Sequence, residues 1–143
     1  MNWFGKAALG AGGVAVLIQL VSFERTNPPV TGEVEAPPEV KALLKRACFD
    51  CHSHDTTWPW YSKVAPVSWL VHRDVVEGRK HLNFSTWAAV KPERKAKKFD
   101  DIVEEVEGGD MPPWFYLPMH PEAKLTPEEQ QTILRWARHA GEP

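Results

Sequence analysis

The sequence lacks three patterns on which many functions depend: a binding patch of basic residues, alternating apolar residues and a catalytic constellation. Its net charge is −2, and the one dense basic stretch, 91–98, is followed directly by acidic residues, as on a solvated helix face. This charge pattern argues against nucleic acid as a partner. No run alternates apolar and polar residues as a half-buried strand does, and no nucleophile stands beside a base. The remaining signals are those of an all-α protein.

Proline and tryptophan are the residues in excess. The 143 residues include 13 Pro and 7 Trp, with 43% apolar and 25% charged residues, which is the balance of a folded globular protein. This length suits one domain with a short segment to spare. The prolines indicate long ordered loops between helices. The tryptophans suggest a large flat apolar object, although Trp also fills ordinary cores.

The N-terminal segment is apolar from Trp3 to Phe23, where Lys6 is the only charge. A positive start before an apolar run is typical of an export signal. Its end, 20–24, lacks the small residues that a signal peptidase needs and has no cysteine to carry a lipid. Because the run is about long enough to cross a bilayer as a helix, we interpret 1–26 as an uncleaved membrane anchor. Cleavage at a poor site, leaving a soluble periplasmic protein, is the alternative.

A proline-rich segment, 27–38, follows the anchor. Such sequences are extended and semi-rigid. We therefore expect a tether that holds the following domain off the membrane surface. The globular domain is then expected over 39–143.

Four helices are expected within this domain, over 39–47, 67–80, 92–107 and from Thr126 onward. The last has the clearest start. Thr126 is its N-cap, Pro127 its first residue, and Glu129 completes a capping box. The predicted domain is thus an all-α bundle of about four helices with long loops.

The chemistry of the chain is concentrated at 48–52, Cys-Phe-Asp-Cys-His. The thiols of Cys48 and Cys51 can add across the two vinyl groups of a haem, while the imidazole of His52 ligates the iron from one side. This pattern is the attachment signal of c-type haem. It predicts one covalently bound haem c.

Three other uses of these residues suit the sequence less well. A disulfide between Cys48 and Cys51 would close so short a loop that it gives little entropic stabilisation. A thiol redox motif belongs to a βαβ context, which is missing here. Zinc held by Cys48, Cys51, His52 and His54 would crowd its ligands, whereas structural zinc sites draw them from separated loops. Export, helical architecture and the apolar helix before the motif agree with haem.

The second axial ligand of the iron is predicted to be Met111, in the run 108–113, Gly-Gly-Asp-Met-Pro-Pro. Glycine lets the backbone approach the haem ring, and the paired prolines fix the loop. A Met and His pair raises the reduction potential relative to two His ligands. A loop Met can also simply fill a gap in a core. The rival ligands, in order, are Met119, His120 and His72.

With these features together, the chain resembles class I cytochromes c, which share the order helix, attachment motif, Met-Pro loop and C-terminal helix. More narrowly, it resembles the bacterial haem-binding domain family built around one CxxCH motif. The resemblance implies a periplasm-facing haem protein. The Trp-rich insertion after the motif departs from ordinary cytochromes c. The matching residues are Cys48 to Ser53, Trp58 to Tyr61, Pro66, Ser68, Trp69, Gly78, Arg79, Asn83 to Ser85, Trp87, Met111, Pro112, Tyr116, His120, Pro121, Leu125 and Trp136.

Residues around the haem are also suggested. Pro66 resembles the cytochrome proline whose carbonyl accepts a hydrogen bond from the proximal imidazole, although it can also simply start a helix. Tyr61, Trp60, Arg79 and Trp87 are candidate donors to the haem propionates. The three aromatic residues can equally pack in the core, and Arg79 can form a solvent ion pair.

Electron transfer is the expected function, because two strong axial ligands leave no open iron site for a substrate. The redox partners would be proteins of the membrane or periplasm. A haem-based sensor or ligand-binding protein is the alternative, if Met111 binds iron weakly or not at all. We do not expect an enzyme, since a peroxidase needs an open site and a polar distal acid or base; that class ranks third. The expected location is the bacterial inner membrane, single-pass, with the haem domain facing the periplasm.

Overall fold

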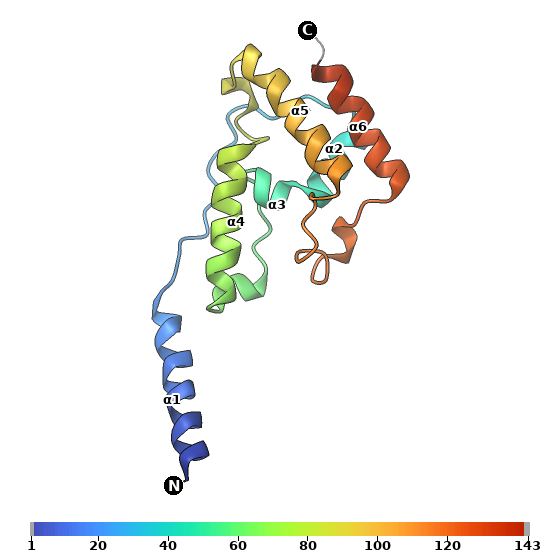
Figure 1. Cartoon of the computed structure of the whole chain (residues 1–143). Coiled ribbons are helices and arrows are strands. Elements are labelled where there is room, and N and C mark those ends of the chain that lie inside the picture. The colour runs from blue at the N-terminus through green and yellow to red at the C-terminus, as the bar shows by residue number, and fades with distance from the viewer. Residues whose placement is uncertain (1, 142–143) are drawn as a thin grey trace.

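The computed structural model describes residues 2–141, and within them it has six α-helices and no strand (Figure 1). The all-α prediction is confirmed. One isolated parallel bridge joins Gly32 to Thr86. The helices are α1 (Trp3–Leu17), α2 (Pro38–Ala47), α3 (Phe49–His52), α4 (Val67–His81), α5 (Pro92–Gly108) and α6 (Pro127–Gly141).

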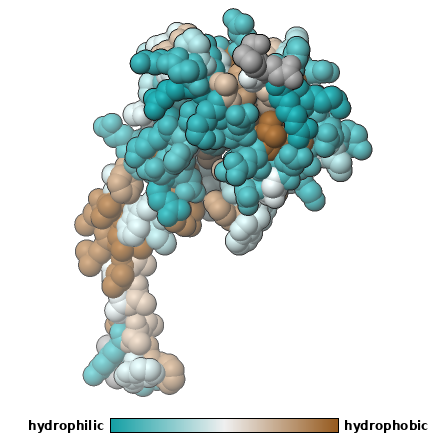
Figure 2. Space-filling model, turned by 45° about the horizontal axis from the view of Figure 1, so that its top comes forward, coloured by the Kyte–Doolittle hydropathy of each residue, from teal (hydrophilic) through white to brown (hydrophobic). Residues whose placement is uncertain are grey.

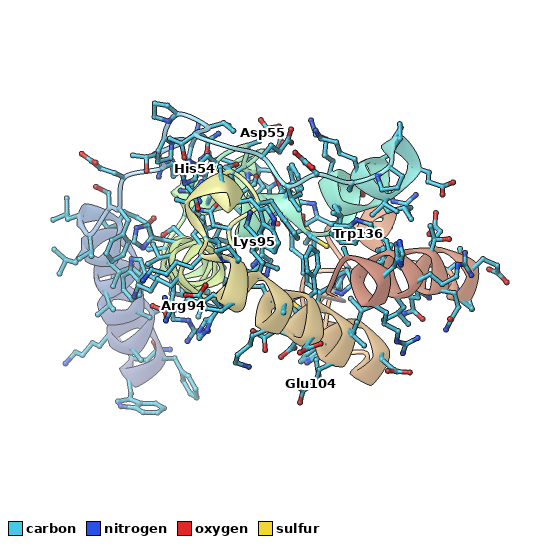
Figure 3. The ribbon with its side chains drawn as sticks, turned by 90° about the horizontal axis from the view of Figure 1, so that it is seen from above. His54, Asp55, Arg94, Lys95, Glu104 and Trp136 are labelled. Atoms are coloured by element: carbon cyan, nitrogen blue, oxygen red, sulfur yellow. The ribbon has the colours of Figure 1, made fainter. Side chains whose placement is uncertain are left out.

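Helices α5 and α6 lie side by side and antiparallel, and α2 packs on α6 (Figure 1). Phe99, Ile102 and Val106 are buried on one face of α5, because their spacing repeats close to the helical period. The ring of Phe99 meets the edge of Trp136 on α6 at 5.3 Å between centroids. Figure 3 shows Glu104 on the other side of α5, pointing away from this core.

Both ends of the α5–α6 connection follow known capping rules. Gly109 ends α5 in the left-handed conformation, with φ at 78°, which glycine adopts without a Cβ penalty. The N–H of Met111 then donates to the Glu105 carbonyl at 3.1 Å. At the start of α6, Thr126 and Glu129 exchange reciprocal hydrogen bonds of 2.9 and 3.3 Å. The capping box predicted from the sequence is confirmed.

The segment 21–37 runs along the domain surface and is bonded to it. The N–H of Val34 donates to the Phe84 carbonyl at 2.9 Å, and the Val34 side chain is buried in the core. The Pro29 carbonyl lies 3.0 Å from Nδ1 of His54. An extended chain leaves its own N–H and C=O groups free to pair with other segments, and here they pair with the domain. The segment 27–38, expected to act as a tether, is therefore bonded to the domain surface along part of its length.

Helix α1 projects from the domain, and none of its residues is buried (Figure 1). Together with the 3-10 turn that follows, it forms an apolar helix of 18 residues, Trp3–Leu20, long enough to cross a membrane. Figure 2 shows its apolar surface against the mostly hydrophilic surface of the domain. An N-terminal helix of this kind is either a signal sequence or a single membrane span.

Candidate functional site

Cys51 and His52 lie on the short helix α3, and Cys48 is the capping residue that joins the end of α2 to the start of α3. The N–H of His52 donates to the Cys48 carbonyl at 2.9 Å, closing one helical turn. Phe49 is buried and stacks on Phe84, with ring centroids 5.3 Å apart. This stacking fixes the turn in the core, so that both free thiols and the imidazole are presented from one turn of helix.

The two thiols are held in their neutral form. Burial raises the pKa of Cys48 to about 12. Burial also raises the pKa of Cys51 to about 12, and the neighbouring carboxylates of Asp50 and Asp74 add to this shift. Thiolates, rather than thiols, exchange disulfides and bind zinc. The environment of these cysteines therefore does not suit a thiol redox motif or a thiolate metal site.

The imidazole of His52 is fixed by two backbone carbonyls. Its Nδ1 lies 3.0 Å from the Gly78 oxygen and 3.1 Å from the Leu82 oxygen. Because carbonyl oxygens only accept hydrogen bonds, Nδ1 carries the proton and Nε2 keeps the lone pair. Burial lowers the pKa of His52, so the ring is neutral. A neutral imidazole with a free Nε2 lone pair is the form that ligates iron.

Pro66 does not orient this imidazole, contrary to expectation. Its carbonyl accepts a hydrogen bond from the Trp69 N–H at 3.1 Å, within the first turn of α4. The carbonyls that reach His52 come instead from the other end of α4, at Gly78 and Leu82. The Gly78 oxygen also accepts the Leu82 N–H at 2.9 Å, and its second lone pair is available to the imidazole. Leu82 caps the end of α4, so its carbonyl has no partner farther along the helix.

Gly78 also allows α4 to approach α3 at backbone distance. A Cβ at this position would lie 2.6 Å from the Cys51 carbonyl oxygen and 3.2 Å from the Cys51 Cβ. A side chain of any size would therefore push the two helices apart. The backbone conformation of Gly78 is that of an ordinary helix, which any residue can adopt. Glycine is therefore required here by the close packing and not by the backbone conformation.

Arg79, suggested by the sequence as a propionate donor, bonds to the protein itself, and its role as a propionate donor stays a prediction. Its Nε donates to the Ser53 carbonyl at 2.7 Å, and its terminal nitrogens donate to the Thr26 carbonyl, Asn27 Oδ1 and Thr56 Oγ1 at 3.0, 3.2 and 2.9 Å. The guanidinium thus ties the segment after α1 to the loop after the motif. Each of its three nitrogens donates to at least one protein acceptor.

Two tyrosines hold the loop between α5 and α6, one by a bond to the motif and one by a bond from the turn before α4. The hydroxyl of Tyr116 donates to Asp50, inside the motif, at 2.7 Å. Tyr116 also stacks on His120, with centroids 4.0 Å apart. Nδ1 of His120 faces the Glu122 carboxylate at 3.2 Å, so its Nε2 accepts from the Tyr61 hydroxyl at 2.6 Å. These contacts hold the Met-Pro loop beside α3.

The four candidates for the second iron ligand differ in their surroundings. Both ring nitrogens of His120 are engaged in hydrogen bonds, and His72 stacks on Phe23 at 4.5 Å. Met119 is exposed to solvent. Met111 is partly buried within the loop that is held beside the motif. Its role as the iron ligand stays a prediction.

Among the aromatic residues suggested as propionate donors, Trp87 is a core residue packed against Phe99 at 5.0 Å, and Trp60 is exposed. Trp58 is a further candidate donor, which the sequence did not single out. Within the part of the chain that is described, its indole Nε1 is buried and has no hydrogen-bond partner. A buried donor without an acceptor is rare and costly, and a haem carboxylate is an acceptor of the kind it lacks. The Trp-Pro-Trp run directly after the motif was the available signal.

His54 does not join the cysteines, as the zinc alternative would require. Its Nδ1 lies 3.0 Å from the Pro29 carbonyl, and its Nε2 lies 2.9 Å from Nδ2 of Asn83. Both ring nitrogens therefore fix the segment 21–37 and the loop before Phe84. The donor set at α3 consists of two neutral thiols and one imidazole, which suits haem attachment better than a zinc ion.

Comparison with known proteins agrees with this site. A family model described as a haem-binding domain matches residues 13–139, which confirms the family resemblance found in the sequence. No curated protein and no solved structure gives a significant match. The matched range includes part of α1 and the whole segment 21–37, in agreement with the bonds that join this segment to the domain.

Proposed function

The chain belongs to the haem-binding domain family, and from that premise we propose that it is a membrane-anchored c-type cytochrome that transfers electrons. Haem binding is the property of the family. Covalent attachment through Cys48 and Cys51 and axial ligation by His52 and Met111 are the proposal. Bound haem would supply one-electron chemistry, accepting an electron from a reduced protein partner as Fe(III) and giving it to an oxidised one as Fe(II).

The observation that carries the proposal is the state of the three motif side chains. Cys48 and Cys51 are free, neutral thiols on one helical turn. His52 on the same turn is neutral, and its Nδ1 proton is directed at two carbonyls. A hydrogen bond at the remote nitrogen fixes the ring orientation and raises the basicity of the coordinating nitrogen. The chain thus presents a proximal ligand already oriented for iron.

The loop contacts support electron transfer over ligand sensing. Tyr116 and Tyr61 fasten the loop that carries Met111 to the motif segment and to the turn before α4. A fastened loop keeps a thioether ligand in place in both oxidation states, which lowers the reorganisation that accompanies each electron. The proposal assigns the protein no enzyme activity, and its partners are redox proteins of the membrane or periplasm.

Location follows from α1. We propose that this helix remains as a single span of the bacterial inner membrane and that the haem domain faces the periplasm. The apolar composition of Trp3–Leu20 and the absence of buried residues on α1 support a lipid environment. Lys6 near the start agrees with a cytoplasmic N-terminus.

Carbon monoxide binding to the reduced protein tests the proposal. The ferrous wild type should not bind carbon monoxide quickly, and its oxidised form should be low-spin with the weak far-red band of Met-to-iron(III) coordination. Met111→Ala should abolish the band, admit carbon monoxide and lower the reduction potential, because the thioether favours reduced iron. Met119→Ala is the matched control and should do none of these. Rapid carbon monoxide binding by the wild type would contradict electron transfer and favour the sensor alternative.

A further inference from the structure

The end of the apolar N-terminal helix is fixed to the start of α4. The Gln19 side chain makes two hydrogen bonds to the backbone of Ala65, accepting from its N–H at 2.9 Å and donating to its carbonyl at 3.1 Å. The indole N–H of Trp69 donates to the Val21 carbonyl at 3.1 Å. The domain therefore begins within hydrogen-bond distance of the last residues of this helix, with no free linker between them.

A group of exposed apolar side chains surrounds this contact. Val64 and Val67 flank Ala65 in sequence, and Leu70 follows Trp69. With Trp60, in the 3-10 turn Trp60–Lys63 before α4, they form what we call the apolar corner. Their side chains are largely exposed, with 70% for Trp60, 44% for Val64, 43% for Val67 and 52% for Leu70. Contiguous exposed apolar residues mark a surface that meets something other than water.

The depth of this corner follows from the length of the helix, and this step rests on the proposed membrane anchor. Trp3–Leu20 spans about 27 Å at the helical rise of 1.5 Å per residue, close to the ~30 Å hydrocarbon thickness of a bilayer. Gln19 and Val21 then lie at the boundary between acyl chains and headgroups. Because Ala65 and Trp69 are bonded to these two residues, the apolar corner lies at the same depth.

We propose that the apolar corner is inserted into the interface of the bilayer that α1 crosses, so that lipid covers it. Tryptophan is favoured at this depth, since its ring is apolar and its N–H is polar. Arg25, whose Nη1 donates to the Ser62 carbonyl at 3.2 Å, places a cation beside the corner, where lipid phosphates lie. The haem domain then rests on the membrane in one orientation.

The loop between α5 and α6 carries a second group of exposed apolar side chains. This loop is at the lower edge of the domain, on the side from which α1 leaves (Figure 1). The start of α4 lies at this edge too. The residues of this second group are Trp114, Phe115 and Met119.

Cysteine accessibility in lipid nanodiscs tests the inference, because both faces of a nanodisc are open to water. The full-length holoprotein carries one added cysteine, either Leu70→Cys in the apolar corner or Val30→Cys in the segment 21–37. The two native side chains are nearly equally exposed, at 52% and 56%. Intact-protein mass spectrometry follows the reaction with a charged maleimide, and the parent protein gives the background from Cys48 and Cys51.

Leu70→Cys should react at least about fivefold more slowly than Val30→Cys, because a thiol held against lipid does not ionise readily. A smaller difference would overturn the inference and show that the apolar corner is in contact with water or with a protein partner. A third variant, Val14→Cys on α1, separates this failure from failure of the anchor. Slow reaction at Val14 with fast reaction at Leu70 overturns only the lipid-covered corner. Fast reaction at both overturns the anchor as well. An unchanged haem spectrum shows that each variant is folded.

Discussion

Nδ1 of His52 lies 3.0 Å from the carbonyl oxygen of Gly78. The same glycine has no room for a Cβ, because one would lie 2.6 Å from the Cys51 carbonyl oxygen. One residue of α4 therefore both orients the proximal imidazole and allows the motif helix to pack at backbone distance. The position of the attachment motif depends on α4, which lies outside the motif in sequence.

Gly78→Ala should destabilise the protein by about 1–3 kcal/mol, because the added methyl group must displace the Cys51 backbone. Alanine has the higher helix propensity, by roughly 1 kcal/mol, so a loss of stability would show that the close contact dominates. Denaturant unfolding of the holoprotein measures the change. Glu77→Ala, one residue earlier on the exposed side, is the control and should leave stability nearly unchanged. Equal effects of the two substitutions would show that α4 does not press on the motif.

Arg79→Lys should loosen the segment after α1, because an ammonium group cannot reproduce the fork geometry of the guanidinium. Hydrogen bonds to Thr26 and Asn27 would be lost together with those to Ser53 and Thr56. Amide hydrogen exchange should accelerate across 26–34, and stability should fall by about 1.5–3 kcal/mol, as for a lost hydrogen bond to a charged group. Arg73→Lys, on the exposed side of α4, should leave exchange in that segment unchanged. Unchanged exchange in Arg79→Lys would mean that the backbone bonds alone hold the segment.

The helices and their caps could be predicted from the sequence, because they depend on residues close together along the chain. The capping box of Thr126 and Glu129 and the apolar face of Phe99, Ile102 and Val106 are examples. The role of the 27–38 segment could not, since Pro-rich composition indicates an extended chain and does not reveal which surface that chain lies on. Its bonds to residues 84–88 join positions about fifty apart in sequence.

The chemistry of the site could be predicted from the sequence, but the backbone groups that orient His52 could not. The spacing of Cys48, Cys51 and His52 indicates haem attachment without any structure. The carbonyls of Gly78 and Leu82 carry no side-chain signal, so the sequence favoured Pro66 by resemblance alone. Backbone acceptors depend on where a helix ends in space, and residue type does not encode that position.

The hydrogen bond from Tyr116 to Asp50 should make stability sensitive to alkaline pH. Burial, and then the Asp50 carboxylate, raise the pKa of Tyr116 above its usual range. The phenol ionises in the unfolded chain at about pH 10, so its contribution is present below that pH and is lost as the pH rises above it. Tyr116→Phe should cost about 1–3 kcal/mol near neutral pH. That cost should shrink above pH ~10, as denaturant unfolding at both pH values would reveal; a cost independent of pH would contradict the shifted phenol.

Covalent attachment is the central claim, and haem retention after acid–acetone extraction and denaturing electrophoresis measures it most directly. The account predicts that the wild-type polypeptide keeps its haem, because thioether bonds to Cys48 and Cys51 survive both treatments. Met111→Ala should also keep it, since that residue holds only the iron. Changing Cys48 and Cys51 together to Ala should release it. Haem that is freely extracted from the wild-type protein would contradict the account.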